Sequence, residues 1–194
     1  MMKIGLTGGI GSGKSIVSSL LEVMGIPVYD ADAGSKRLTI TSPLIRQGLI
    51  GLFGETIYRG DAIDRKRLAA CIFSDPEMLK RVNAIIHPEV SRHFLDWADR
   101  QTSSSGICAI ETAILFESGF NRLVDLSLMV TAPLERRIER VMARDGATRD
   151  EVLHRIKNQW PDEVKKTYAS YIIYNEERQA LIPQLTAFLA GLRR

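Results

Sequence analysis

The stretch Gly8-Gly9-Ile10-Gly11-Ser12-Gly13-Lys14-Ser15 decides the fold of this chain. An apolar run at 3–7 precedes it and is typical of a strand. Apolar residues at 17, 20, 21 and 24 follow it with the spacing of one helix face. The glycine-rich stretch is therefore expected to be a loop between a strand and a helix, and its pattern is G-x-x-x-x-G-K-[ST].

This loop has the chemistry of a phosphate-binding loop, or P-loop. Glycines allow the backbone to approach a ligand closely, and successive N–H groups at a helix N-terminus form a nest for anions. Lys14 adds a cation for the β- and γ-phosphates, and Ser15 offers a hydroxyl to Mg²⁺. A flexible turn could look similar, but a chance match to the whole pattern is roughly a one-in-a-hundred event. The residues expected to bind ATP are Gly9, Ile10, Gly11, Ser12, Gly13, Lys14 and Ser15.

The composition is that of an ordinary globular chain of 194 residues, 45% apolar and 25% charged, and its length fits one domain with small subdomains. The formal charge of +3, from 26 basic and 23 acidic residues, is too small to indicate a nucleic-acid partner. No run of about 18 apolar residues is present, so no membrane span is expected. Cys71 and Cys108 lack metal-like spacing and fit a reduced compartment. We expect the protein to be cytoplasmic and monomeric.

Strand-like and helix-like segments alternate along the chain, which predicts an α/β fold with a five-stranded parallel sheet flanked by helices. A long helical region separates the second strand from the third, and Tyr58 is expected in a short hairpin or loop within it. Helix starts are indicated at Ser42-Pro43 and Asp64. The expected strands are 3–7, 27–29, 107–111, 126–131 and 171–174.

One helix boundary is predicted inside the region that follows residue 74. Ser74 and Glu77 fit a capping box at the start of a helix. His87-Pro88 is expected to end that helix, because the residue before a proline avoids the α region. Another helix then follows to about residue 100. A lone histidine at such a junction is more often a structural residue than a catalyst.

Acidic residues follow the predicted strands. Asp30 and Asp32 are two residues apart, and positions i and i+2 of an extended chain point to the same side. One of them could orient an acceptor hydroxyl and take its proton, or the pair could cap the next helix, and the spacing leaves both open. Glu111 could hold Mg²⁺ through water or face solvent, and Glu117 could contact a substrate or begin a loop. Parallel strands end at one edge, so these groups and the P-loop are expected to converge on one cleft.

Arginines recur on the helix that is expected to start at Pro133. Arg136, Arg140 and Arg144 are four residues apart and form one stripe, with Arg137 beside it. Such a stripe is usually a solvated face, but beside a P-loop it also suits a lid that neutralises a transferring phosphoryl group. The apolar face of the helix is expected to carry Leu134, Ile138, Val141 and Met142.

The sequence resembles the dephospho-CoA kinase family over nearly its whole length. Beyond the P-loop, the segments Asp30-Ala31-Asp32, His87-Pro88 and Leu115-Phe116-Glu117 carry the resemblance in this order. They are far more specific than the P-loop alone. Further matching positions are Arg67, Arg140, Arg144-Asp145, Arg155-Ile156, Gln159, Ile173 and Asn175.

The resemblance implies an enzyme that transfers the γ-phosphoryl group of ATP, with Mg²⁺, to the ribose 3′-hydroxyl of dephospho-CoA. It implies one P-loop kinase domain, with a core of residues 1–32, 104–133 and 167–194, a helical CoA-substrate region of 33–103 and a helical lid of 134–166. It gives catalytic roles to Asp32, Lys14, Arg140 and Arg144, and a nucleotide contact to Asn175. It gives substrate contacts to Asp32, Arg67, His87, Leu115 and Glu117, and metal contacts to Ser15 and, through water, Glu111.

The sequence departs from the family pattern at four places, one of them around Ser170-Tyr171, where the Asp usual before an Asn-Gly pair is replaced. Glu111 stands where similar sequences often have Asp, and Ala113 stands where they have Pro. The glutamate side chain is one methylene longer, which changes the geometry of a water-mediated Mg²⁺ contact. Asn175-Glu176 replaces a usual Asn-Gly pair near the adenine side of the site.

Two other classes of protein share parts of this pattern. Another small-molecule P-loop kinase, of a nucleotide or shikimate type, would have the same loop. The long helical insert after Asp32 suits a bulky acceptor better. A nucleotide-dependent switch would need loops that read the γ-phosphate and a partner surface, and the sequence carries no such signature.

Overall fold

The computed structural model describes residues 1–73 and 75–192. The chain divides into two compact units. The first, here called the sheet unit, comprises Met1–Tyr29 and Ala98–Arg194. The second, the helical unit, comprises Asp30–Trp97.

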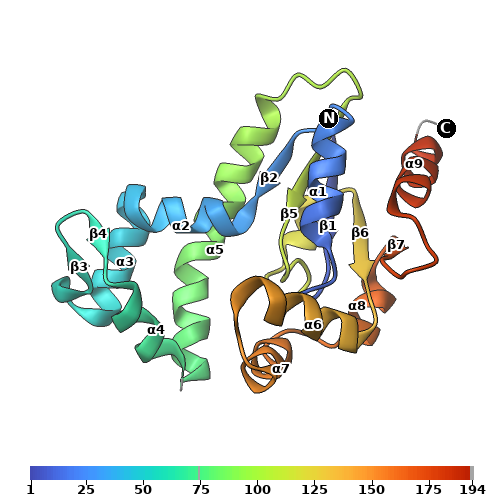
Figure 1. Cartoon of the computed structure of the whole chain (residues 1–194). Coiled ribbons are helices and arrows are strands. Elements are labelled where there is room, and N and C mark those ends of the chain that lie inside the picture. Colours follow the sequence, from blue (N-terminus) through green and yellow to red (C-terminus); the bar gives the residue numbers. More distant parts are fainter. Residues whose placement is uncertain (74, 193–194) are drawn as a thin grey trace. The chain divides into compact units, whose positions relative to one another are not determined.

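The sheet unit is built on a five-stranded sheet in the order β2-β5-β1-β6-β7 (Figure 1). The strands β1, β5, β6 and β7 pair in parallel, and Ile4 in the middle of β1 lies opposite Ala109 on one side and Leu126 on the other. This confirms the predicted parallel sheet. The strand bounds are β1 Met2–Thr7, β2 Val28–Asp30, β5 Ile107–Glu111, β6 Leu126–Thr131 and β7 Tyr171–Tyr174.

Side chains alternate across β1, and each face buries a different set of partners. Ile4 and Leu6 are fully buried in a cluster with residues of α1 and α9, among them Leu21 and Leu185. Gly5 faces the other side, where a Cβ would lie 2.7 Å from a methyl of Leu115. The first and last helices of the chain therefore cover the same face of the sheet. Their bounds are α1 Lys14–Val23 and α9 Leu181–Gly191.

A second, smaller cluster joins the helices that follow β6. It contains Ile138, Val141, Ala147 and Val152, and Ile10 of the P-loop packs against it. The buried side chains of α6 are Arg137, Ile138 and Val141, whereas Leu134 and Met142 are 48% and 37% exposed. The predicted apolar face was therefore right only at its centre. The helices are α6 Leu134–Asp145, α7 Arg149–Lys157 and α8 Asp162–Tyr168, and a 3-10 turn, η2, spans Phe120–Leu123.

The helical unit confirms several local signals in the sequence. Ser42 caps α3 by accepting from the N–H of Ile45 at 3.4 Å, with proline in the first turn. Tyr58 begins a two-stranded hairpin, and its hydroxyl donates to the carbonyl of Thr39 at 2.8 Å. Asp64 accepts from the N–H of Arg67 at 3.0 Å at the start of α4. The elements are α2 Ala31–Thr41, α3 Pro43–Phe53, η1 Glu55–Ile57, β3 Tyr58–Arg59, β4 Ala62–Ile63, α4 Arg65–Phe73 and α5 Pro76–Asp99.

Helix α5 continues through Pro88, so the predicted break at His87-Pro88 is wrong. An interior proline removes one backbone hydrogen bond and costs about 3 kcal/mol. The helix buries apolar side chains four residues apart on both sides of Pro88: Val82, Ile86, Val90 and Phe94 are 2%, 8%, 1% and 0% exposed. Each contributes about 1.5–3 kcal/mol when buried, so the packing outweighs the proline.

The start of α5 is capped by Asp75, whose carboxylate accepts from the N–H groups of Glu77 and Met78 at 3.0 and 2.9 Å. The predicted capping box at Ser74 lies outside the described residues. Over the described ranges, no helix combines the length and apolar character needed to cross a membrane.

Candidate active site

The P-loop connects the end of β1 to the start of α1, as the sequence predicts. Gly11 and Gly13 have φ angles of 78° and 95°, which side chains with a Cβ rarely adopt. Gly13 is the left-handed N-cap of α1. The N–H of Ser12 donates to the carbonyl of Gly9 at 3.0 Å, which turns the loop over the helix end. Helix N–H groups that lack intrahelical partners therefore lie where an anion can reach them.

Two buried hydroxyls in this loop lack a hydrogen-bond partner. They belong to Thr7 and Ser12, which are 0% and 1% exposed. Buried polar groups nearly always have a partner, because leaving one unpaired costs about 1–3 kcal/mol. Both hydroxyls are shielded from solvent, so the groups that face an anion at this loop are the N–H groups of the nest.

Lys14 forms an ion pair with Glu111, through Nζ and Oε1. The two side chains are 16% and 14% exposed. They meet because β1 and β5 are parallel neighbours whose register places Leu6 opposite Glu111. The predicted meeting of the P-loop with the acid at the end of β5 is therefore present.

The oxygen groups at this edge have the chemistry of a magnesium site. Ser15 is exposed in the first turn of α1, and Glu111 stands at the adjacent strand end. Hydroxyl and carboxylate oxygens are the ligands that Mg²⁺ prefers, usually with several waters and substrate phosphates. Across the part of the chain that the structure describes, no group of three or more His, Cys, Asp or Glu side chains could hold a metal by itself. The residues fit a metal that arrives together with a phosphate ligand.

Arg140 and Asn175 lie beside the P-loop. The amide of Asn175 donates to the carbonyl of Ser12 at 2.8 Å, and its backbone N–H donates to Thr131 at 2.8 Å. Arg140 lies 3.4 and 3.5 Å from the carbonyl oxygens of Gly11 and Ser12. These contacts are long, so the guanidinium stands near the loop without a close partner among them.

The other arginines of the stripe are engaged with surface carboxylates. Arg144 donates to Asp145 at 2.7 Å, and this pair raises the pKa of the guanidinium and lowers the pKa of the carboxyl. Arg155 pairs with the same carboxylate at 2.8 Å. Arg136 pairs with Glu139 at 3.1 Å. Of the three stripe members, only Arg140 is recorded in contact with the P-loop among the described residues.

Sequence reasoning missed a buried cation on α6. Arg137 has a side chain only 6% exposed, pairs with Asp162 at 2.8 Å, and donates through Nε to the carbonyl of Ile10 at 2.9 Å. Gln159 accepts from the N–H of Ile10 at 3.0 Å. The sequence did indicate that Arg137 could be buried, because its position is adjacent to the apolar stripe of Ile138 and Val141. Nothing in the sequence pattern indicated Asp162.

Glu117 is held by a buried lysine. Its Oε1 lies 2.8 Å from Nζ of Lys165, whose side chain is 0% exposed, and accepts from the N–H of Trp160 at 2.9 Å. Lys165 also donates to the carbonyl of Ala113 at 2.6 Å. Glu117 Oε2 is buried without a hydrogen-bond partner. Glu117 therefore joins the loop after β5 to α8 and keeps one oxygen for a further donor.

Leu115 is fully buried beside Gly5. A side chain with no exposed area packs the interior. The Leu115 side chain therefore belongs to the core of the sheet unit, and the substrate contact that the resemblance implies for this residue stays a prediction.

The predicted acceptor residues belong to the helical unit. β2 ends at Asp30, and Asp32 is exposed in the first turn of α2. The premise that both aspartates lie in extended chain is therefore wrong. Asp30 is the N-cap of α2 and accepts from the N–H of Ala33 at 2.9 Å. The capping interpretation thus holds for Asp30.

Arg67 and His87 lie on different helices of this unit. Arg67 is on α4 and donates to the hydroxyl of Thr56 at 2.5 Å. His87 is inside α5, where burial lowers its pKa.

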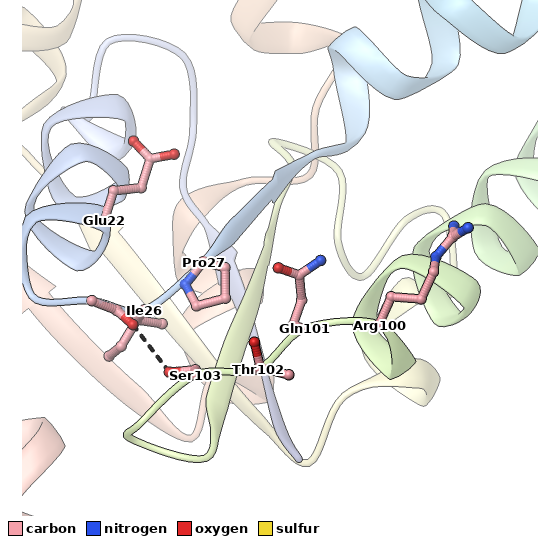
Figure 2. A pocket seen from close by; sticks show the side chains of 8 residues that line it. Glu22, Ile26, Pro27, Arg100, Gln101, Thr102 and Ser103 are labelled. Carbon is pink, nitrogen blue, oxygen red and sulfur yellow. Dashed lines mark hydrogen bonds between the residues drawn. The ribbon is translucent and has the colours of Figure 1, made fainter.

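A separate pocket of about 360 Å³ lies at the amino ends of β2 and β5. Figure 2 shows Glu22 and Arg100 at its opposite ends. Its floor includes Pro27 and Ser103, whose hydroxyl donates to the carbonyl of Gly25 at 3.0 Å. Because the P-loop follows the carboxyl end of β1, this pocket is not part of the phosphate site.

A P-loop at the carboxyl edge of a parallel sheet, with an acid on the adjacent strand and arginine-bearing helices beside it, defines the class of P-loop kinases. The family model described as dephospho-CoA kinase matches residues 2–180. The chain belongs to the dephospho-CoA kinase family.

Individual proteins agree with the family match. The chain is 46% identical to a dephospho-CoA kinase of Bacteroides fragilis, over 98% of this chain and 93% of that protein. It is 45% identical to one of Porphyromonas gingivalis, over 100% and 95%. A crystal structure of the Thermus thermophilus protein TT1252 has a TM-score of 0.83 at 38% identity, over 99% of this chain and 96% of that one. The similarity therefore spans both units.

Proposed function

We propose that the protein phosphorylates the ribose 3′-hydroxyl of dephospho-CoA with ATP, giving coenzyme A and ADP, the final step of coenzyme A synthesis. The observation that carries this proposal is the P-loop, with its left-handed glycines at 11 and 13 and Lys14 beside Glu111, in a chain that belongs to the dephospho-CoA kinase family. The segments Asp30-Ala31-Asp32, His87-Pro88 and Leu115-Phe116-Glu117 support the acceptor assignment.

In this proposal, separate groups of residues hold ATP, activate the acceptor hydroxyl and stabilise the transferring phosphoryl group. The P-loop N–H groups and Lys14 hold the β- and γ-phosphates, and Asn175 fixes the carbonyl side of the loop. Asp32 orients the 3′-hydroxyl and takes its proton as the new oxygen–phosphorus bond forms. The bond from the γ-phosphorus to the β-bridging oxygen breaks, and ADP leaves. Arg140 and Arg144 stabilise the charge on the equatorial oxygens.

Mg²⁺ would be held by Ser15 directly and by Glu111 through water, where it neutralises phosphate charge. The ion pair of Lys14 with Glu111 keeps both side chains at the loop. Arg67, His87 and Glu117 contact dephospho-CoA in this proposal. We also propose that the protein is a monomer, which sedimentation of the purified protein checks, and that it is cytoplasmic, which fractionation of cells checks.

An ADP-release assay tests the function against its alternatives. With ATP and Mg²⁺, ADP release should depend on dephospho-CoA, and phosphorus NMR should find the new phosphate on the 3′-oxygen. Shikimate and nucleoside monophosphates should give background rates. Release that any of these supports as well as dephospho-CoA would identify another small-molecule kinase. Slow release that no acceptor stimulates would indicate a switch.

A further inference from the structure

The peptide of Ile10, at the tip of the P-loop, is tied to the helical segment 134–168 at three points. Its N–H donates to Gln159 at 3.0 Å, and its carbonyl accepts from Nε of Arg137 at 2.9 Å. Its side chain packs against the cluster that contains Ile138 and Val141. The loop tip therefore depends on this segment for both its polar groups and its apolar side chain.

Asp162 holds the other end of the Arg137 guanidinium. The Nη1–Oδ1 distance is 2.8 Å, and the two side chains are 6% and 14% exposed. Asp162 is fixed in turn by the hydroxyl of Thr131, which donates to Oδ2 at 3.0 Å. A planar guanidinium serves two acceptors at fixed angles, which a lysine ammonium on a flexible stem does not.

The guanidinium also lies directly against the loop backbone. A Cβ on Gly9 would overlap Nη2 of Arg137 and would lie 2.8 Å from Oδ1 of Asp162. Gly9 has no positive φ, so it is this lack of space that requires glycine there. A Cβ on Gly11 would overlap the carbonyl oxygen of Arg137. At Gly9 and Gly11, therefore, the P-loop lies too close to α6 for a Cβ.

We propose that Arg137 and Asp162 are a positioning pair for ATP binding, which hold the Ile10 peptide so that the P-loop N–H groups face the phosphates. This inference rests on the proposed function only in taking ATP as the P-loop ligand. Pre-organisation of the loop removes an ordering cost from nucleotide binding. The pair touches neither phosphate nor acceptor, and acts through the backbone at Ile10.

The first test is nucleotide affinity, measured by equilibrium titration of the full chain with ATP. R137M removes both contacts, R137K keeps the charge without the fork, and D162N keeps the volume while weakening the hold on Arg137. A loop that is no longer held must be ordered when ATP binds, and this ordering lowers the affinity. We expect R137M and R137K to weaken ATP binding by about 10- to 10²-fold, and D162N less. R149M, at an exposed arginine on α7 paired with Glu135, is the matched control and should bind as the wild type does.

A double variant distinguishes an effect of the pair on ATP affinity from an effect on the stability of the fold. Replacing a buried ion pair by apolar residues is often neutral or stabilising. R137M/D162L should therefore recover most of the thermal midpoint that R137M alone loses, yet ATP binding should stay weak because the Ile10 carbonyl has lost its donor. Recovery of ATP affinity in the double variant, or wild-type affinity in R137K, overturns the proposal. If the double variant does not fold, R137K decides the matter alone.

The kinetic constants distinguish this inference from the function itself. The variants should raise KM for ATP and leave KM for dephospho-CoA within about twofold. Asp32, Arg67 and His87 belong to the helical unit, and Glu117 is held by Lys165 and the N–H of Trp160 rather than by the pair. Equal increases in both constants would contradict a role confined to the P-loop. A wild-type protein that binds ATP without phosphorylating dephospho-CoA would refute the proposed function, while the titrations would still test the pair.

Discussion

At the scale of single residues, Asp30 and Asp32 have the same side-chain chemistry and differ in their position on the backbone at the start of α2. Asp30 caps α2 with its carboxylate, and Asp32 is exposed in the first turn of that helix. The sequence could not separate them, because an aspartate before a helix fits a cap and a base equally well. The structure shows the capping contact of Asp30, and the assignment of Asp32 as the base stays a prediction.

This difference provides a matched pair of substitutions. Asp32→Asn should lower kcat by roughly 10²–10⁴-fold, because the amide cannot take the proton of the acceptor hydroxyl. Asp30→Asn should leave kcat unchanged, because asparagine caps a helix about as well as aspartate. ATP titration should show normal binding in both. Loss of turnover in Asp30→Asn alone would move the base to Asp30.

The arginine stripe gives a second prediction at this scale. An arginine supplied to a phosphoryl-transfer site contributes about 10³–10⁵ in rate, whereas a solvated one contributes almost nothing. Arg140→Ala, beside the loop, should lower kcat/KM by at least about 10²-fold, and so should Arg144→Ala if its helix closes on the nucleotide. Arg136→Ala, whose exposed partners are Glu139 and Glu177, should be nearly silent. Mild and equal effects at all three positions would show a solvated face.

At the scale of elements, α5 shows how packing overrides a local signal. A proline predicts a break, but it does not report the apolar stripe that continues on both sides of it. Pro88 itself is exposed. Pro88→Ala restores a donor for the carbonyl four residues earlier and removes no buried contact. It should raise the thermal midpoint by several degrees, at about 2–4 °C per kcal/mol.

Arg81→Ala, at an exposed position of the same helix, should change stability by less than about 0.5 kcal/mol. A lower midpoint for Pro88→Ala would mean that the proline fits a bend which the helix needs. Thermal unfolding of the three proteins, followed by circular dichroism, makes the comparison.

Helix α8 gives the second prediction for an element. It is joined to the loop after β5 by Lys165, whose side chain is fully buried against Glu117. Lys165→Met leaves the carboxylate without its cation, and breaking such a buried pair costs about 3–5 kcal/mol. Lys166→Met is the neighbouring control, because its ion pair with Glu163 is exposed and exposed pairs contribute about 0–1 kcal/mol. Similar unfolding free energies for the two variants, measured with urea, would show that the buried pair is not needed.

At the scale of the whole molecule, most of the sheet unit could be predicted because its signals are local. The strand, the glycine loop and the capped helix at Lys14 are adjacent in sequence. The buried pair of Arg137 and Asp162 could not be predicted, because its partners are 25 residues apart and meet only through the fold. The ion pair of Lys14 with Glu111 is more distant still, yet parallel pairing of β1 with β5 made its location predictable.

Stability as a function of pH is a property of both units together. Burial lowers the pKa of His87 below its ordinary value of 6.5, so the unfolded chain binds the proton more readily. Stability therefore falls as pH drops below about 6.5, down to the lowered pKa of the folded protein. The carboxyls of Asp145 and Glu151 have lowered pKa values, through hydrogen bonds from Arg144 and from Thr148 respectively. Their contribution is present above the ordinary carboxyl range and is lost at more acidic pH, as they protonate.

Substitutions can separate the loss of stability due to His87 from the loss due to the carboxyls. His87→Gln should abolish the loss of unfolding free energy that begins near pH 6.5, and it should leave the loss at lower pH, where the carboxyls titrate. Asp145→Asn should reduce the loss of unfolding free energy at lower pH, because it removes one of the carboxyls. It should leave the loss that begins near pH 6.5, because His87 is still in place. Urea unfolding at a series of pH values from about 7 to 3.5 measures both slopes. A His87→Gln variant whose stability still falls between about pH 6.5 and 5 would mean that another group titrates in that window.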